Sequence, residues 1–184
     1  MNDVSIRPAT PADIAAIARI YAEAVWNGPA TFEIEPPDET EMARRLHVLL
    51  AGDYPYLVAE RSGAIVGYAF AGPYHLRAAY HWTLEDSIYL DPQFQGQGIG
   101  RLLLRQLLAD AEAGGFRQMV ALIGDAANTA SIALHAAAGF QPIGTLQSVG
   151  FKHGRWLDVV VMQRSLGSAD SNPPEHDPER FRRT

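Results

Sequence analysis

The sequence predicts a mixed α/β fold of the α+β kind, in which a mostly antiparallel sheet is flanked by helices. The chain has 184 residues, of which 47% are hydrophobic and 20% are charged, and this suits one globular domain. Its periodic segments follow the order strand, two helices, three strands, helix, strand, helix, two strands. Because strands and helices do not alternate strictly, the order argues against a doubly wound parallel sheet.

The first part of the chain is expected to form one strand and two helices. Residues 4–7 alternate between apolar and polar side chains, as a half-buried strand does. Residues 10–13, Thr-Pro-Ala-Asp, combine a capping residue, a proline and an acidic residue, which is typical of a helix start. Asn-Gly-Pro at residues 27–29 should end this helix, and a second helix is expected from Asp38 to about Leu50.

The middle of the chain is expected to form three strands. Residues 56–59 and 65–70 are strand-like, and the turn between them is short enough for a hairpin. We expect a loop at residues 72–73, Gly-Pro, and a third strand at residues 83–90. Asp91 and Pro92 should end that strand.

The last elements follow a glycine-rich segment at residues 95–100, which leads into a helix with leucines on one face. A buried strand is expected at residues 119–123, and a helix at residues 129–138 that ends at Gly139. The two final strands are predicted at residues 145–151 and 155–164.

The domain is predicted to span residues 1–166, with a flexible tail at residues 167–184. The tail segment is polar, contains three prolines and shows no periodicity.

Composition excludes several classes of function. The net charge of −6 argues against a general nucleic-acid binder, which would carry a basic face. The chain has no cysteine, which rules out disulfides, thiolate metal sites and cysteine nucleophiles. His75 and His81 lack the spacing and neighbours of a metal site, so no metal is expected. With no membrane or targeting segment recognised, we expect a cytoplasmic protein without a membrane partner.

The glycine-rich segment suggests phosphate binding. Glycines let backbone N–H groups approach a ligand, and the helix that follows presents its positive end. Arg101 and Arg105 add positive charge. A P-loop would require Gly-Lys-Ser/Thr, and a dinucleotide fold would require an N-terminal βαβ unit; neither is present. A plain glycine-rich turn remains the alternative.

The pattern Gln95-x-x-Gly98-x-Gly100 resembles the motif by which acetyltransferases of the GNAT superfamily hold the pyrophosphate of coenzyme A. The resemblance covers residues 4–166 and is more specific for the phosphinothricin acetyltransferase branch in four segments: residues 31–33, 77–85, 128–135 and 149–158. It implies a GNAT fold, acetyl-CoA as co-substrate, and N-acetylation of phosphinothricin, methionine sulfoximine or methionine sulfone. The resemblance also implies a homodimer.

Two catalytic residues are expected. Glu85 would take the proton from the acceptor amine, although a glutamate at a strand end can also be merely exposed. His135 lies in an apolar helix, where a histidine is often only a packed core residue. The resemblance places it near the thioester sulfur, as a polarising or proton-donating group.

Coenzyme-binding residues are expected in three segments. The backbone of Ile88, Tyr89 and Leu90 should pair with the pantetheine arm like an added strand. Asn128 is expected to cap its helix, and the resemblance adds a contact with the coenzyme. The remaining predicted coenzyme residues are Gln95, Gly96, Gln97, Gly98, Ile99, Gly100, Arg101, Ser131 and His135.

The acceptor site is predicted around Arg77, whose guanidinium suits a carboxylate or an oxoacid group. Tyr80, Trp82 and Glu85 follow in the sequence, and Phe32 and Glu33 would close over the acceptor from another loop. The alternative is a surface loop with one cation–π contact.

The function expected is direct transfer of acetyl from acetyl-CoA to the α-amine of a small amino-acid-like acceptor. The lack of cysteine excludes an acetyl-cysteine intermediate. Two alternatives stay open: acetylation of another amine, such as an antibiotic, a polyamine or a protein N-terminus, and an acyl-CoA sensor without catalysis.

Overall fold

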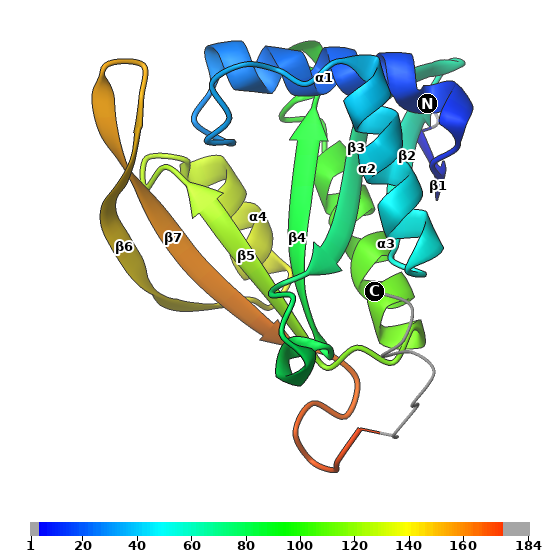
Figure 1. The fold of residues 1–184 in the computed structure, drawn as a ribbon, viewed down its shortest axis with the longest axis vertical. Helices are drawn as coiled ribbons and strands as arrows, with labels where there is room; N and C mark the ends of the chain where they lie inside the picture. Colours follow the sequence, from blue (N-terminus) through cyan, green and yellow to red (C-terminus); the bar gives the residue numbers. More distant parts are fainter. Residues whose placement is uncertain (1–3, 175–184) are drawn as a thin grey trace.

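The computed structural model of the chain describes residues 4–174. Within them, seven strands form one sheet with the order β1-β2-β3-β4-β5-β7-β6 (Figure 1). The strands are β1 (Val4–Pro8), β2 (Tyr56–Arg61), β3 (Ala64–Pro73), β4 (Thr83–Leu90), β5 (Gln118–Gly124), β6 (Gln141–Lys152) and β7 (Arg155–Ser165). The helices are α1 (Ile14–Asn27), α2 (Glu39–Ala51), α3 (Ile99–Ala113) and α4 (Thr129–Ala137), with short 3₁₀ turns η1 (Pro11–Asp13), η2 (Ala78–Tyr80) and η3 (Pro92–Phe94).

The sheet parts in its middle, between β4 and β5. All other neighbouring strands are antiparallel, whereas β4 and β5 are parallel and pair only from Thr83↔Gln118 to Asp86↔Ala121. Beyond Asp86, β4 stays paired with β3 and β5 stays paired with β7, so the two strands diverge toward their C-terminal ends (Figure 1). The sheet therefore offers two unpaired strand edges that face each other.

Two apolar clusters hold the helices on opposite faces of the sheet. Ile17 of α1 and Leu46 of α2 pack with Tyr68 of β3 on one face. On the other face, Leu104 and its neighbours in α3 pack against Leu84 of β4. Because strand side chains alternate between faces, successive residues of β4 point to different clusters.

The predicted fold class and element order are confirmed, and three boundaries differ by three residues or more. The first helix begins with η1, and α1 starts only at Ile14. The expected loop at residues 72–73 is wrong: Gly72 pairs with Glu85 and Pro73 with Leu84, because proline is tolerated at the end of a strand. Strand β6 starts at Gln141 rather than residue 145, since register shifts near Pro142 and Gly144 obscure its alternation in the sequence.

The predicted tail is described only as far as residue 174, and residues 175–184 lie outside the described part of the chain. The Arg117 side chain donates hydrogen bonds to Ser168 Oγ, Ala169 O and Asn172 Oδ1. The first residues after β7 are thus tied to the turn before β5. No helix among residues 4–174 is long and apolar enough to cross a membrane.

Candidate active site

A cavity of about 490 Å³ opens where β4 and β5 part. Its walls come from β4, β5, α4 and the loop before α3. The predicted coenzyme residues that line the cavity are Ile88, Tyr89, Leu90, Gln95, Gly96, Gly98, Gly100, Arg101, Asn128, Ser131 and His135. The parted strands therefore bring together segments that are far apart in the sequence.

The glycine loop has a backbone conformation that favours glycine. Gly96 has φ +71° and Gly98 φ +83°, both in the left-handed region, and a Cβ at either position would meet no protein atom within 4 Å. Gly98 directly precedes the first turn of α3, whose N–H groups lie at the positive end of the helix. The loop thus leaves open space for an anion beside backbone donors.

Two predicted members of this loop point elsewhere. Ile99 is 1% exposed and belongs to the core around α3. The Gln97 side chain donates to Gln93 O (2.9 Å) and accepts from Arg61 Nη1 (2.6 Å), so it holds the loop in place. Neither residue lines the cavity.

A second hollow of about 400 Å³ lies beside α3 and α4, and Arg101 borders both cavities. Arg105 and Arg164 also line it, against a single acidic residue, Glu112. Positive charge is therefore concentrated next to the glycine loop, although the whole chain carries a net charge of −6.

The free edge of β4 lines the same cavity. Ile88, Tyr89 and Leu90 pair with β3 on one side, and no residue of β5 pairs with them on the other. The Tyr89 ring packs edge-on to Tyr21 (5.0 Å between centroids) and stacks on Tyr68 (5.2 Å), so it is fixed in the core. The backbone of this edge is left to accept an extended ligand.

Glu85 lies half-buried on β4, in the segment where β4 and β5 are still paired. Burial raises the pKa of the Glu85 carboxyl to about 7, and the negative charge of Asp86 adds to the rise. Alternation places Glu85 on the sheet face of Tyr89 and α1, whereas Asp86 shares the face of Leu84 and α3. A carboxyl with this pKa can take up and release a proton near neutral pH.

His135 is buried in α4, as a core histidine would be, and it also lines the cavity. Its Nε2 lies 3.0 Å from Asp86 Oδ2, and its Nδ1 lies 2.8 Å from the Ser131 carbonyl oxygen. Burial lowers the pKa of the imidazole, but the hydrogen bond and charge of Asp86, together with the hydrogen bond to the Ser131 carbonyl, outweigh this, and the pKa is raised overall.

Asn128 caps α4 as predicted: its Oδ1 accepts a hydrogen bond from Ser131 N (3.2 Å). Its Nδ2 donates to Gly124 O at the end of β5 (3.4 Å). Asn128 thus fixes the start of α4 to β5 and sets the position of Ser131 and His135 along the cavity wall.

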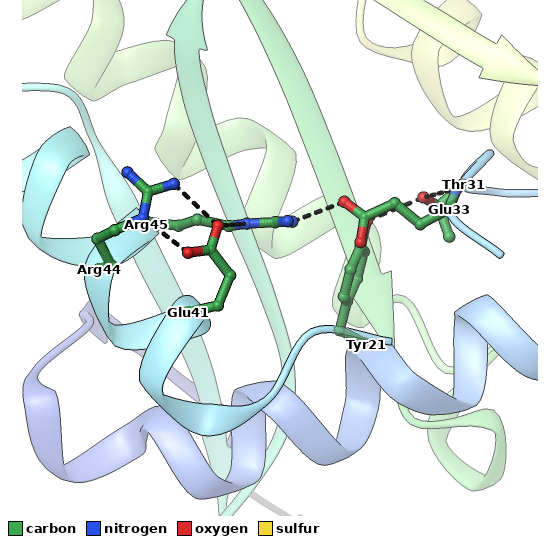
Figure 2. A network of polar contacts seen from close by, with 6 residues as sticks. All are labelled: Tyr21, Thr31, Glu33, Glu41, Arg44 and Arg45. Atoms are coloured by element: carbon green, nitrogen blue, oxygen red, sulfur yellow. Dashed lines mark hydrogen bonds and ion pairs between the residues drawn. The ribbon is translucent and has the colours of Figure 1, made fainter. Parts of the chain in front are cut away.

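The loop with Phe32 and Glu33 is held by a polar network between α1 and α2 (Figure 2). The Tyr21 hydroxyl and the Thr31 hydroxyl lie 2.8 Å apart, and Arg45 Nη1 donates to Glu33 Oε1 at 2.7 Å. Arg45 also donates to Glu41, which Arg44 contacts as well. The carboxylate of Glu33 is therefore already paired within the protein.

The same loop is fixed from its other side by the β6–β7 hairpin. Lys152 is 4% exposed, and its Nζ donates to Gly28 O (3.0 Å) and Thr31 O (2.8 Å). The Phe32 ring covers Gly150, where a Cβ would lie 2.2 Å from Phe32 Cε2. Burial lowers the pKa of Lys152. These contacts make the loop a fixed wall.

The predicted acceptor residues lie in two places, at η2 and β4 and in the loop between α1 and α2. Arg77 and Tyr80 are exposed at η2, near the start of β4, while the loop with Phe32 lies toward the opposite end of that strand (Figure 1). The Tyr80 ring packs on His75 (4.9 Å) and Tyr74 (5.7 Å). Trp82 contacts the His81 ring at 5.3 Å. None of the predicted acceptor residues lines the cavity between β4 and β5.

Sequence reasoning missed three contacts at this site: Asp86 with His135, Thr31 with Tyr21, and Lys152 with the Phe32 loop. One signal was available for Asp86. In a strand, Asp86 shares one face with apolar Leu84 and Ile88, so its side chain is expected to be buried. A buried carboxylate requires a hydrogen-bonding or charged partner. No group of three or more metal-ligating side chains gathers among residues 4–174.

The chain is similar to known acetyltransferases. The family described as Acetyltransferase (GNAT) matches residues 17–140. Over 171 residues, the chain is 52% identical to a phosphinothricin N-acetyltransferase of Alcaligenes faecalis, covering 93% of this chain and 87% of that protein. It is 38% identical to an L-methionine sulfoximine/L-methionine sulfone acetyltransferase of Salmonella typhimurium, covering 89% of this chain and 95% of the relative.

A solved structure agrees with this similarity. The crystal structure of a GNAT superfamily phosphinothricin acetyltransferase from Sinorhizobium meliloti in complex with AcCoA superposes with a TM-score of 0.91. The two sequences are 47% identical, and the match covers 94% of each chain.

Proposed function

The chain belongs to the acetyltransferase (GNAT) family, and from this membership we propose that it transfers acetyl from acetyl-CoA to the α-amine of a small amino-acid-like acceptor. The acceptor class is that of phosphinothricin, methionine sulfoximine and methionine sulfone, which the names of its relatives specify. The observation that carries the proposal is the cavity between the parted strands β4 and β5, with the glycine loop at one end. The compartment proposed is the cytoplasm.

The residues present fit acetyl-CoA, which supplies an acetyl group activated as a thioester. The left-handed loop at Gly96 and Gly98 would hold the pyrophosphate with its N–H groups, supported by Arg101. The edge of β4 at Ile88 to Leu90 would pair with the extended pantetheine arm.

On the opposite sheet face, Glu85 takes the proton from the acceptor amine, directly or through water. Its pKa of about 7 leaves a large fraction of the carboxyl ionised at neutral pH, and the ionised form is a base. Because the chain has no cysteine, the amine attacks the acetyl carbon without an acetyl-cysteine intermediate.

The acceptor preference is tested by a thiol-release assay with methionine sulfone, methionine sulfoximine, phosphinothricin, ordinary amino acids, aminoglycosides and a peptide N-terminus. We expect activity on the first three.

Arg77→Ala should raise the KM of these acceptors about 10- to 100-fold, since a hydrogen bond to a charged group contributes about 1.5–3 kcal/mol. The KM of acetyl-CoA should not change. Arg19→Ala, which removes an arginine with a 58% exposed side chain on α1, serves as the control.

The same assay separates the alternatives. Activity only on aminoglycosides or on the peptide would reject the proposed acceptor class and favour another amine. Coenzyme binding without thiol release from any acceptor would favour an acyl-CoA sensor. An unchanged acceptor KM in Arg77→Ala would remove Arg77 from the acceptor site.

A homodimer is proposed through the β6–β7 hairpin. Large apolar side chains are exposed on it: Leu146 (51%), Val149 (52%), Phe151 (58%) and Trp156 (63%). In addition, the rings of Phe151 and Trp156 contact each other at 5.3 Å between centroids. Exposed apolar patches of this kind commonly mark protein interfaces.

Trp156→Glu is therefore expected to shift the chain from dimer to monomer, because it places a charge in the apolar contact. Light scattering after size exclusion measures the mass. Val48→Glu, at a 53% exposed position on α2, should leave the dimer intact. A wild-type chain that is monomeric at all concentrations would contradict the proposal.

A further inference from the structure

A buried carboxylate and a buried imidazole meet in the wall of the cavity. The Asp86 side chain on β4 is 1% exposed and the His135 side chain on α4 is 5% exposed, and both line the space between the parted strands. His135 Nε2 and Asp86 Oδ2 are 3.0 Å apart. The two residues are 49 positions apart in the sequence, so the fold alone creates this pair.

The number of protons in the pair follows from its partners. The Ser131 carbonyl oxygen can only accept a hydrogen bond, so His135 Nδ1 carries a hydrogen at 2.8 Å from that oxygen. The 3.0 Å contact between Nε2 and Asp86 Oδ2 then requires one more proton, on the nitrogen or on the oxygen. Both ring nitrogens are thus already bonded within the protein.

Asp86 also has a polar atom that the protein leaves unsatisfied. Asp86 Oδ1 is buried and has no hydrogen-bond partner among the described residues. A buried carboxylate oxygen in this state is costly, and such atoms are often found where a ligand or a catalytic proton belongs. By contrast, both carboxylate oxygens of buried Asp13 accept hydrogen bonds, from Arg7 and from Thr10.

We propose that Asp86 is a positioning residue that holds His135 as an imidazolium, so that the pair stores one proton on the coenzyme side of the sheet. This inference rests on the proposed acetyl transfer. When the bond between the acetyl carbon and the sulfur breaks, its two electrons stay on the sulfur. His135 then gives the sulfur the proton on Nε2 and gives up its hydrogen bond to Asp86 Oδ2, while Nδ1 keeps its hydrogen on Ser131 O. Glu85, on the opposite face, holds the proton from the amine and releases it to solvent, from which the Asp86–His135 pair regains its own.

The surroundings of His135 agree with this assignment. The groups that face its ring are Asp86 from β4, Ser131 from its own helix, and the edge-on ring of Phe140, 5.0 Å away. Arg101 from the start of α3 lines the same cavity. Burial lowers the pKa of His135, and Asp86 raises it above the ordinary value of 6.5. Removing the Asp86 charge leaves burial as the main influence, so the pKa should then fall below 6.5.

The first test is a pH titration of the imidazole nitrogens by NMR, with ¹⁵N-labelled histidine and no coenzyme. His135 is assigned by the loss of its signals in His135→Gln, and exposed His47 serves as the internal reference. We expect a midpoint above 6.5 in the wild type and in Asp86→Glu, and below 6.5 in Asp86→Asn. A His135 midpoint that is the same in Asp86→Asn and the wild type would overturn the proposal. This measurement needs no activity, so it remains decisive if the proposed acetyl transfer fails.

The second test is a double-mutant cycle on turnover. Asp86→Asn and His135→Gln should each lower kcat at least ten-fold, and the double variant should lose no more than the stronger single variant, because the two residues act as one unit. The KM of the acceptor should stay within two-fold. Losses that multiply in the double variant would show independent roles and overturn the proposal. If Asp86→Asn does not fold, Asp86→Glu replaces it. We then expect Asp86→Glu to be more active than His135→Gln above pH 6.5.

Discussion

Glu85→Gln is expected to lower turnover by about 10²- to 10⁴-fold at saturating acetyl-CoA, the contribution typical of general-base catalysis. Glutamine keeps the shape of the side chain but cannot accept the amine proton. Coenzyme binding should hardly change, since Glu85 does not line the cavity between β4 and β5. Steady-state kinetics and calorimetry measure the two effects. Glu39→Gln, at an exposed position on α2, is the control, and unchanged turnover in Glu85→Gln would remove Glu85 from the mechanism.

The role of Glu85 as the base also predicts how turnover and stability change with pH. The base must be ionised, so wild-type turnover should rise with pH through about 7, and this limb should be absent in Glu85→Gln. Stability moves the opposite way: the folded pKa lies above the unfolded value of 4.5, so ionisation destabilises the folded state as pH rises from 4.5 through about 7. At pH 8, Glu85→Gln should therefore be more stable than the wild type by up to about 3 kcal/mol. At pH 4, the difference should disappear.

Gly98→Val is expected to abolish coenzyme A binding measured by calorimetry. Gly98 has φ +83°, where a β-branched residue costs about 1–3 kcal/mol of backbone strain. The new side chain would also extend beside the N–H groups that approach the pyrophosphate. The loop would either move or block its ligand.

Gly63→Val is the matched control for this substitution. Gly63 has φ +78°, and a Cβ there would also meet nothing within 4 Å, but it lies in the turn between β2 and β3 and does not line the cavity. The control should lose a similar amount of stability and still bind coenzyme A. Normal binding by Gly98→Val would reject the proposed role of the glycine loop.

Local patterns in the sequence were enough to predict most elements of the fold. The strand at residues 83–90 and the end of α1 at Asn27 lie where alternation and the Asn-Gly-Pro break predict them. Prediction failed at Gly72 and at the start of β6. At both places proline and glycine indicate a loop, but pairing with a neighbouring strand keeps the backbone extended.

The sequence by itself determined the glycine loop, the cap of α4 by Asn128 and the position of Glu85 just before the parted strand edge. These features depend on residues close together in the chain, so their spacing reveals them. Only the tertiary structure decided that Asp86 binds His135, that Lys152 fixes the loop of Phe32, and that η2, which Arg77 caps, lies apart from that loop. Such contacts depend on how strands pair and how helices pack across them, and no local pattern in the sequence records that arrangement.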